Sequence, residues 1–391
     1  MDIDRIRAET PGTRTVAHLL ASGSALPPAP VTEAVIDHLR LEERIGGYEA
    51  QAARMPELNG IYDDVAALIG ADPAEIALVE NATVAWCHAF YALPLGSGDR
   101  VLTCEAEYAA NYVAFLHRAK RDGIVIDVVP SDETGEVDVA ALERMVDPSV
   151  KLIAMTWIPT NGGLVNPAER IGAVAKAHGI PYLLDACQAV GQMPIDVRRL
   201  NCDFLSATGR KFLRGPRGTG FLYVAAPWLE RLEPAMLDHF GAPWVARDRY
   251  ELRPDARRFE TWENSYALRA GLGAAVRYAL DMGLETIRER AWGLADYVRA
   301  EVSGLKGATL RDIGRQHCAI ASFTIDGLDP RPTVLKLREQ AIHIGASDPA
   351  STRLDAEARH LPPVFRIAPH YYNTRDEIDR AIAALDALPR G

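Results

Sequence analysis

The sequence predicts an α/β fold, with a mainly parallel seven-stranded sheet in a large domain and a smaller α+β domain at the C-terminal end. Three observations predict it. From about residue 60 to 225, short apolar runs alternate with stretches of helical periodicity, which is typical of a parallel sheet covered by helices. The chain has 391 residues, more than a single core usually holds. Its 48% hydrophobic and 25% charged residues are those of a globular protein.

Seven apolar runs are the expected strands of the large sheet, in chain order 76–79, 100–103, 125–129, 152–155, 182–184, 204–206 and 221–224. The segments between the first six have the apolar spacing of helices, with candidates at 82–93, 112–117, 139–145 and 168–178. The last run follows Gly218-Thr219-Gly220. Because this turn is short and rich in glycine, we expect that strand to run back along its predecessor.

The C-terminal part has a different pattern. A charged, proline-containing stretch at 247–255 leads into a predicted long helix from about Tyr266 to Leu305. A strand at 319–323 and helices at 332–340 and 375–388 follow. This mixture predicts the smaller α+β domain.

Charge and composition exclude several classes of protein. The net charge of −10 argues against binding to nucleic acid or to an anionic membrane. No apolar stretch approaches the ~18 residues of a membrane span, and Met1–Arg7 is charged rather than apolar. The five scattered cysteines lack metal-binding or disulfide spacing. We expect a cytoplasmic enzyme with mostly buried thiols and no metal site.

Two residues at the ends of neighbouring predicted strands carry the main functional prediction. Asp185 ends the run Leu183-Leu184, and Lys211 follows Ser206-Ala207-Thr208-Gly209-Arg210. Pyridoxal phosphate (PLP) needs such a pair, because a lysine holds its aldehyde as a Schiff base and a carboxylate keeps its pyridine nitrogen protonated. The pair predicts a PLP site with Lys211 and Asp185 as catalytic residues.

A phosphate site is expected where the first strand turns into a helix, at Ala82, Thr83 and Val84. Backbone N–H groups and a hydroxyl at a helix N-terminus bind anions, although the same run fits a simple helix cap. The hydroxyl of Thr208 is a second candidate, with an ordinary strand-end hydroxyl as its alternative.

Four more side chains are candidates for the same site. Tyr108 can stack on the cofactor ring or serve in packing. Asn161 and Gln188 carry amides that can donate to the cofactor's phenolate oxygen or bond nearby backbone. Arg366 has the fork that binds a substrate carboxylate, but a lone arginine is usually a solvated surface residue.

In combination, these motifs resemble fold type I PLP enzymes of the class V aminotransferase and cysteine desulfurase superfamily, from about Leu19 to Leu388. The resemblance implies an amino-acid substrate and a homodimer with active sites at the interface. It assigns Tyr108 to ring stacking, Gln188 and Asn161 (or Thr160) to the phenolate oxygen, and Arg366 to the substrate carboxylate. It also implies an N-terminal segment, 1–30, that includes Ser24 and closes over the pocket. The large domain would span 31–265, and the linking helix and small domain 266–391.

Three departures from the desulfurase pattern stand out. Arg210 replaces the usual histidine before the lysine and is a candidate for the phosphate. Trp262 and Glu263 replace small and hydroxyl residues after Arg258-Phe259-Glu260. The loop at 345–353 has no cysteine, and Cys318 lies at a strand start. Desulfurases carry a persulfide-forming cysteine on that loop, so this route is not expected.

The motifs at 158–163, 208–218 and 258–263 are together most similar to those of isopenicillin N epimerase-like proteins and C–S lyases. We therefore expect β-elimination from a cysteine S-conjugate, which gives pyruvate, ammonia and a thiol. A class V aminotransferase and an epimerase are the alternatives, since all three reactions begin with removal of the α-proton. A non-catalytic binding protein is disfavoured by the presence of both Lys211 and Asp185, and a dinucleotide-binding enzyme by the lack of a GxGxxG turn.

Overall fold

A computed structural model describes residues 1–390 of the chain and confirms the predicted α/β fold. The large sheet has seven strands in the order β2-β8-β7-β6-β5-β3-β4. Their bounds are Ile76–Val79, Gly220–Val224, Phe204–Thr208, Tyr182–Asp185, Val150–Thr156, Arg100–Cys104 and Val125–Val129. All neighbouring pairs are parallel except those of β8, which runs antiparallel to both β7 and β2. The expected return strand at 221–224 is therefore confirmed.

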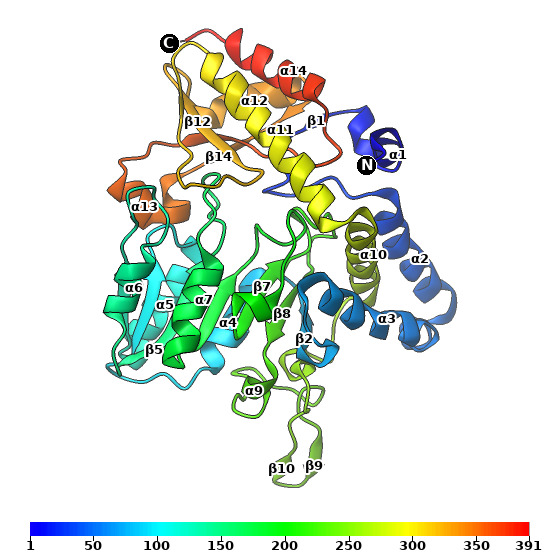
Figure 1. Ribbon diagram of the computed structural model, residues 1–391. Coiled ribbons are helices and arrows are strands. Elements are labelled where there is room, and N and C mark those ends of the chain that lie inside the picture. Colours follow the sequence, from blue (N-terminus) through cyan, green and yellow to red (C-terminus); the bar gives the residue numbers. More distant parts are fainter. Residues whose placement is uncertain (391) are drawn as a thin grey trace.

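Helices cover the large sheet (Figure 1), and strands such as β2, β6 and β7 are therefore buried along their whole length. They are α4 (Ala82–Ala92), α5 (Ala109–Asp122), α6 (Val139–Met145), α7 (Ala168–His178), α8 (Val197–Leu200) and α9 (Ala226–Leu229). Since the parallel strands all point the same way, the residues that follow them meet at one edge of the sheet.

Gly220 shows how closely the backbone packs at that edge. A Cβ atom on this residue would lie 2.5 Å from the carbonyl oxygen of Ala207 and 2.9 Å from the carbonyl carbon of Asn81. Only glycine therefore lets β8 start beside the end of β7 and the beginning of α4.

The C-terminal lobe contains a four-stranded sheet in the order β11-β12-β15-β14. Its strands are Ala308–Leu310, Ala321–Ile325, Val364–Ile367 and Gly345–Ser347, and its helices are α12 (Pro330–Glu339), α13 (Arg353–Ala358) and α14 (Arg375–Asp386). The expected single helix at 266–305 is wrong. It is two helices, α10 (Tyr266–Met282) and α11 (Leu284–Gly304), because Gly283 between them has φ 79° and ψ 118°.

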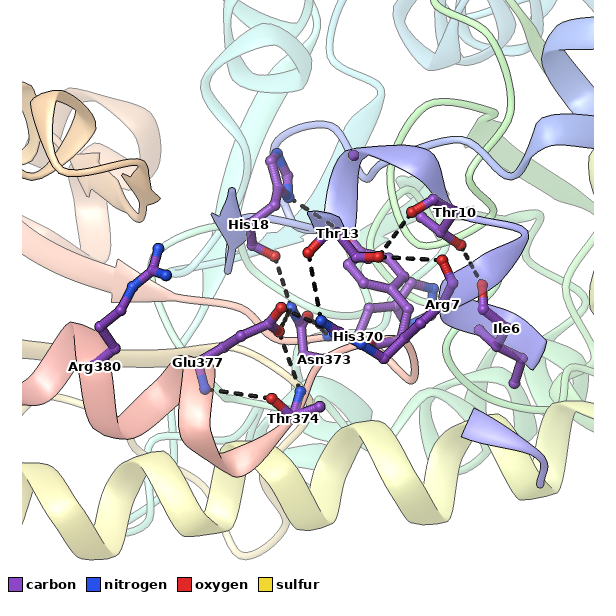
Figure 2. A network of polar contacts seen from close by, with 12 residues as sticks. Ile6, Arg7, Thr10, Thr13, His18, His370, Asn373, Thr374, Glu377 and Arg380 are labelled. Atoms are coloured by element: carbon purple, nitrogen blue, oxygen red, sulfur yellow. Dashed lines mark hydrogen bonds and ion pairs between the residues drawn. The ribbon is translucent and has the colours of Figure 1, made fainter. Parts of the chain in front are cut away.

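The N-terminal segment packs against the C-terminal lobe. After α1 (Ile3–Ala8), the short strand β1 (Ala17–His18) pairs with β13 (Ile342–His343). Figure 2 shows the polar network that joins these distant parts of the chain. Arg7 donates to Glu377 at 2.9 Å and to the carbonyl of Tyr372 at 2.9 Å. Asn373 donates to the carbonyl of His18 at 3.1 Å.

Several elements were not predicted, among them two long helices and a hairpin. Helices α2 (Ala29–Ile45) and α3 (Gly47–Ile69) precede the large sheet and pack on α10. Strands β9 (Trp244–Ala246) and β10 (Arg249–Tyr250) form an exposed hairpin in the charged stretch, and it projects from the body of the molecule (Figure 1). In residues 1–390, every helix is too short or too polar to cross a bilayer.

Candidate active site

A cavity of about 500 Å³ opens at the carboxyl edge of the large sheet. Its wall includes residues that follow β2, β3, β5, β6 and β7, which is why side chains far apart in the sequence meet there. Most of the predicted site residues lie on this wall, namely Ala82, Thr83, Val84, Tyr108, Asp185, Gln188, Thr208, Arg210 and Lys211.

Asp185 is the last residue of β6 and only 6% exposed. Its Oδ1 accepts the N–H of Cys187 at 2.9 Å, and its Oδ2 accepts Nδ2 of Asn111 at 2.9 Å. Burial raises the pKa of this carboxyl, against the opposing effects of those two donors and of Lys211. A cationic nitrogen would be stabilised beside such a group, because no arginine or lysine forms an ion pair with it in residues 1–390.

Lys211 lies three residues beyond the end of β7 and is 9% exposed. The turn that carries it is fixed by the backbone, since Gly215 donates to the carbonyl of Gly209 at 2.7 Å and Arg214 to that of Lys211 at 2.9 Å. The lysine amine and the Asp185 carboxylate thus share one cavity, as the strand spacing predicts.

The first turn of α4 offers an anion site on the same wall. The N–H of Val84 is already taken by the side chain of Asn81, at 3.0 Å. The N–H groups of Ala82 and Thr83 belong to the first turn, where a helix supplies no acceptor of its own. These two amides and the Thr83 hydroxyl are therefore the donors that α4 can offer to a phosphate.

Two arginines border this anion site and differ in their contacts. The guanidinium of Arg210 donates to the carbonyl oxygen of Gly23 in the N-terminal segment, so it is engaged away from α4. Arg217 also lies on the cavity wall, and its side chain is exposed. Within residues 1–390, the guanidinium of Arg217 has no hydrogen bond or ion pair.

Thr160, rather than its neighbour Asn161, lies on the cavity wall. The amide of Asn161 points to the C-terminal lobe, where it donates to the hydroxyl of Thr352 at 2.8 Å and accepts from Ser347. Gln188 donates weakly to Thr160, at 3.5 Å, and its buried Oε1 has no partner in residues 1–390.

Arg366 and Ser24 lie outside the wall of the cavity. Arg366 reaches Thr160 from β15, and burial lowers the pKa of its guanidinium to about 10. Its Nε is buried without a partner in the described part of the chain. The backbone N–H of Ser24 donates to the carbonyl oxygen of Leu20 at 3.1 Å, within a turn of the N-terminal segment.

Sequence reasoning missed two residues behind Asp185. Asn111 lines the cavity and donates to both Asp185 and the buried Glu107, at 2.9 Å each. The signal was present, since Glu107 and Asn111 are four residues apart at the start of α5 and flank the predicted Tyr108.

The cysteines occupy two kinds of position. Among residues 1–390, Cys187 is the one cysteine on the cavity wall. Cys318 is fully buried, and burial raises the pKa of its thiol to about 12. Cys104 and Cys202 are also buried, whereas Cys87 and Cys187 are partly exposed, so three of the five thiols are in the core.

The residues of this cavity suit PLP. Lys211 offers an amine for its aldehyde, Asp185 a buried carboxylate for its ring nitrogen, and α4 an anion site for its phosphate. The exposed face of Tyr108, at 38%, is free to stack against a ring.

Comparisons with known proteins point the same way. The profile of the family described as aminotransferase class-V matches residues 17–381. A probable cysteine desulfurase from Methanothermobacter thermautotrophicus is 30% identical over 386 residues, which is 97% of this chain and 96% of the relative.

Solved structures share the fold. A cysteine desulfurase from Thermococcus onnurineus NA1 matches with a TM-score of 0.91 at 23% identity, covering 98% of this chain and 97% of that one. C-DES, described as a cystine C–S lyase, matches in a complex with its product cysteine persulfide (TM-score 0.88, 23% identity, 97% and 99% covered). A C-DES variant with glycine covalently linked to its PLP cofactor matches at a TM-score of 0.89 and 22% identity, covering 98% and 99%.

Proposed function

The chain belongs to the class V aminotransferase family of PLP-dependent enzymes, and on this premise we propose that it cleaves the C–S bond of an S-substituted cysteine. The substrate and one water would give a thiol, pyruvate and ammonium. The relative from Methanothermobacter is named a probable cysteine desulfurase, and one structural neighbour at 23% identity is a cystine C–S lyase. Both names describe reactions at the sulfur of an amino acid, which supports a sulfur-containing substrate.

The choice of elimination over sulfur transfer to a protein thiol rests on the 345–353 loop. Ser347 and Ser351 are there, but no cysteine is. Asn161 ties the loop down through Ser347 and Thr352, and Cys318 is buried among core residues. A persulfide acceptor must be accessible as a thiolate, and the C-terminal lobe offers none in residues 1–390.

The side chains of the cavity divide the work of such a reaction. When bound, PLP withdraws electrons from the α-carbon of an amino acid whose amino group it holds. Lys211 Nζ would take the α-proton, and the carboxylate of Asp185 would hold a proton on the ring nitrogen. The sulfur would then leave with the electron pair of the C–S bond and take up a proton as a thiol.

Substrate binding would depend on Arg366 at the rear of the cavity. Its guanidinium is held at Thr160, and its Nε lacks a partner, so a substrate carboxylate would supply the missing acceptor. The N-terminal segment 1–30, with Ser24, would cover the substrate together with the lobe at 266–391. The large domain at 31–265 would hold the cofactor.

We further propose a homodimer whose interface borders the cavity. Exposed aromatic rings support a dimer, because Tyr108 on the cavity wall is 38% exposed, and Trp262 and Tyr48, which line a second cavity, are 46% and 72% exposed. Large apolar surfaces of this kind often mark protein contacts. Sedimentation of the purified protein at several concentrations measures the state directly.

The reaction is tested by incubating the PLP-loaded protein with cystine and with a series of S-alkyl-L-cysteines. The proposal expects pyruvate, ammonium and the thiol in equal amounts, with cysteine persulfide as the sulfur product of cystine. Alanine formed from cysteine, with loss of that activity in Cys187→Ala, would instead identify a desulfurase that uses the one thiol of the cavity. A keto acid that retains sulfur would identify an aminotransferase.

A further inference from the structure

The side-chain amide of Asn111 bridges two buried acids at the floor of the cavity. Its Nδ2 donates to Asp185 Oδ2 and to Glu107 Oε1, at 2.9 Å each. An amide NH₂ group has two hydrogens about 120° apart, so it can serve two acceptors at once. Both neighbours are carboxyl groups, whose oxygens accept hydrogen bonds. The NH₂ group of Asn111 must therefore face them, because the flipped amide would turn its oxygen toward another acceptor.

Glu107 is held in place by neutral donors alone. It accepts from the Tyr108 N–H at 2.8 Å, from the Thr103 hydroxyl at 2.9 Å and from the hydroxyl of Thr156. No arginine or lysine pairs with it in residues 1–390. Burial raises the pKa of Glu107 to about 7, and the nearby Asp185 adds to this effect.

The carboxylate of Asp185 is therefore fixed through both oxygens. Oδ1 accepts the backbone N–H of Cys187 in the turn that follows β6, and Oδ2 accepts from Asn111. Two donors on separate oxygens restrict rotation about the Cβ–Cγ bond. The remaining lone pairs can then face the cavity, where Asn111 and Asp185 both lie on the wall.

We propose that Asn111 is a positioning residue for Asp185, and that Glu107 anchors Asn111 by accepting its second hydrogen. In this arrangement the first turn of α5 sets the angle at which the Asp185 carboxylate meets the ring nitrogen of the cofactor. The inference rests on the proposed role of Asp185 and is independent of which bond of the substrate is cleaved.

A double-mutant cycle tests this positioning role. Asn111→Leu keeps the size of the side chain and removes both donors, and Asp185→Asn removes the carboxylate. Each single variant and the double variant are titrated with PLP, and both the affinity and the absorption spectrum of the bound cofactor are recorded. We expect Asn111→Leu to weaken PLP binding about tenfold and to alter the spectrum, since a hydrogen bond to a charged group is worth roughly 1.5–3 kcal/mol.

Coupling is the deciding result. In the Asp185→Asn background, Asn111→Leu should lower the affinity for PLP only slightly further, because its effect depends on the Asp185 carboxylate. An equal loss in both backgrounds would overturn the inference and leave Asn111 as an ordinary packing residue. Should Asn111→Leu fail to fold, the same cycle with Asn111→Ser, which keeps one hydroxyl donor, gives the same comparison.

Asn59→Leu is the matched control. It makes the same change at an exposed position of α3, where Asn59 accepts from Arg257 and contacts neither Glu107 nor Asp185, so PLP affinity and spectrum should stay within about twofold of the parent. If Asp185→Asn itself binds PLP unchanged, the role of Asp185 fails and this inference fails with it. If the cycle shows coupling while no C–S cleavage is found, the positioning role stands and the proposed reaction alone is lost.

Discussion

Arg366 donates from Nη1 to both oxygens of Thr160, at 2.6 Å to the carbonyl and 2.7 Å to the hydroxyl. This contact joins β15 of the C-terminal lobe to the loop that follows β5 of the large sheet. It places a buried cation directly behind the cavity wall. The lobe thereby contacts the wall of a cavity whose own lining residues all lie between positions 80 and 218.

Replacement of Arg366 by lysine should raise KM for the amino acid and lower kcat/KM at least tenfold. Lysine cannot bind Thr160 and a carboxylate together as a fork, and the lost charged hydrogen bond is worth roughly 1.5–3 kcal/mol. Steady-state kinetics with the preferred substrate measure this. Arg353→Lys, at an exposed site on α13, is the control and should match the parent. Unchanged KM in Arg366→Lys would contradict the assignment.

Arg217→Gln should weaken the binding of PLP about tenfold and leave the binding of pyridoxal almost unchanged. The guanidinium of Arg217 has no protein partner in residues 1–390 and lies on the same cavity wall as the first turn of α4, so a phosphate bound there would be its anion. Titration of the apoprotein with each compound gives both affinities. Arg199→Gln removes an exposed cation elsewhere and serves as control. Equal losses for PLP and pyridoxal would show that Arg217 does not contact the phosphate.

The packing of the N-terminal segment, which contains His18, against the C-terminal lobe should weaken in acid. Burial lowers the pKa of this imidazole from 6.5 to about 4, and the nearby His343 contributes. Because the folded pKa lies below the unfolded one, the stabilisation is complete above pH 6.5 and is lost as the pH falls toward 4. The loss of folding free energy is on the order of 3 kcal/mol.

Thermal unfolding between pH 7 and 4.5 measures that effect. The Tm of His18→Gln should fall less steeply with acid than the Tm of the parent. His178→Gln, at an exposed position in the last turn of α7, should keep the slope of the parent. Parallel curves for His18→Gln and the parent would contradict the prediction.

Gly283→Ala should destabilise the protein by about 1–2 kcal/mol. The residue has φ 79° between α10 and α11, a conformation that strains any side chain. Gly293→Ala is the matched control within α11, where a Cβ would meet nothing within 4 Å. That change should stabilise by roughly 0.5–1 kcal/mol, because alanine favours the helix. Chemical denaturation of both variants tests the contrast.

The strand–helix alternation was readable because buried parallel strands must be apolar throughout, while their helices are apolar on one face. The break at Gly283 was missed, since a single glycine inside a periodic stretch does not reveal its φ value. Helices α2 and α3 were also missed; α3 spreads its apolar residues over several faces and contains Pro56.

Within the site, the limits of prediction are clearest at Thr160 and Asn161. Both are polar residues after β5, and only the path of the loop decides which one faces the cavity. The amide of Asn161 is drawn to Ser347 and Thr352, which lie about 190 residues later in the chain and therefore could not be placed beside it from local pattern.

The sequence by itself determined the order of the strands along the chain and the residues that end them, because strand ends follow directly from the apolar pattern. It thereby placed Asp185 and Lys211 at one edge of a sheet. Only the tertiary structure decided which neighbours these residues meet. Asn111 reaches Asp185 because β3 and β6 lie on either side of β5. Arg366 reaches Thr160 because the lobe packs over that edge, and such long-range contacts depend on packing that no local stretch of sequence encodes.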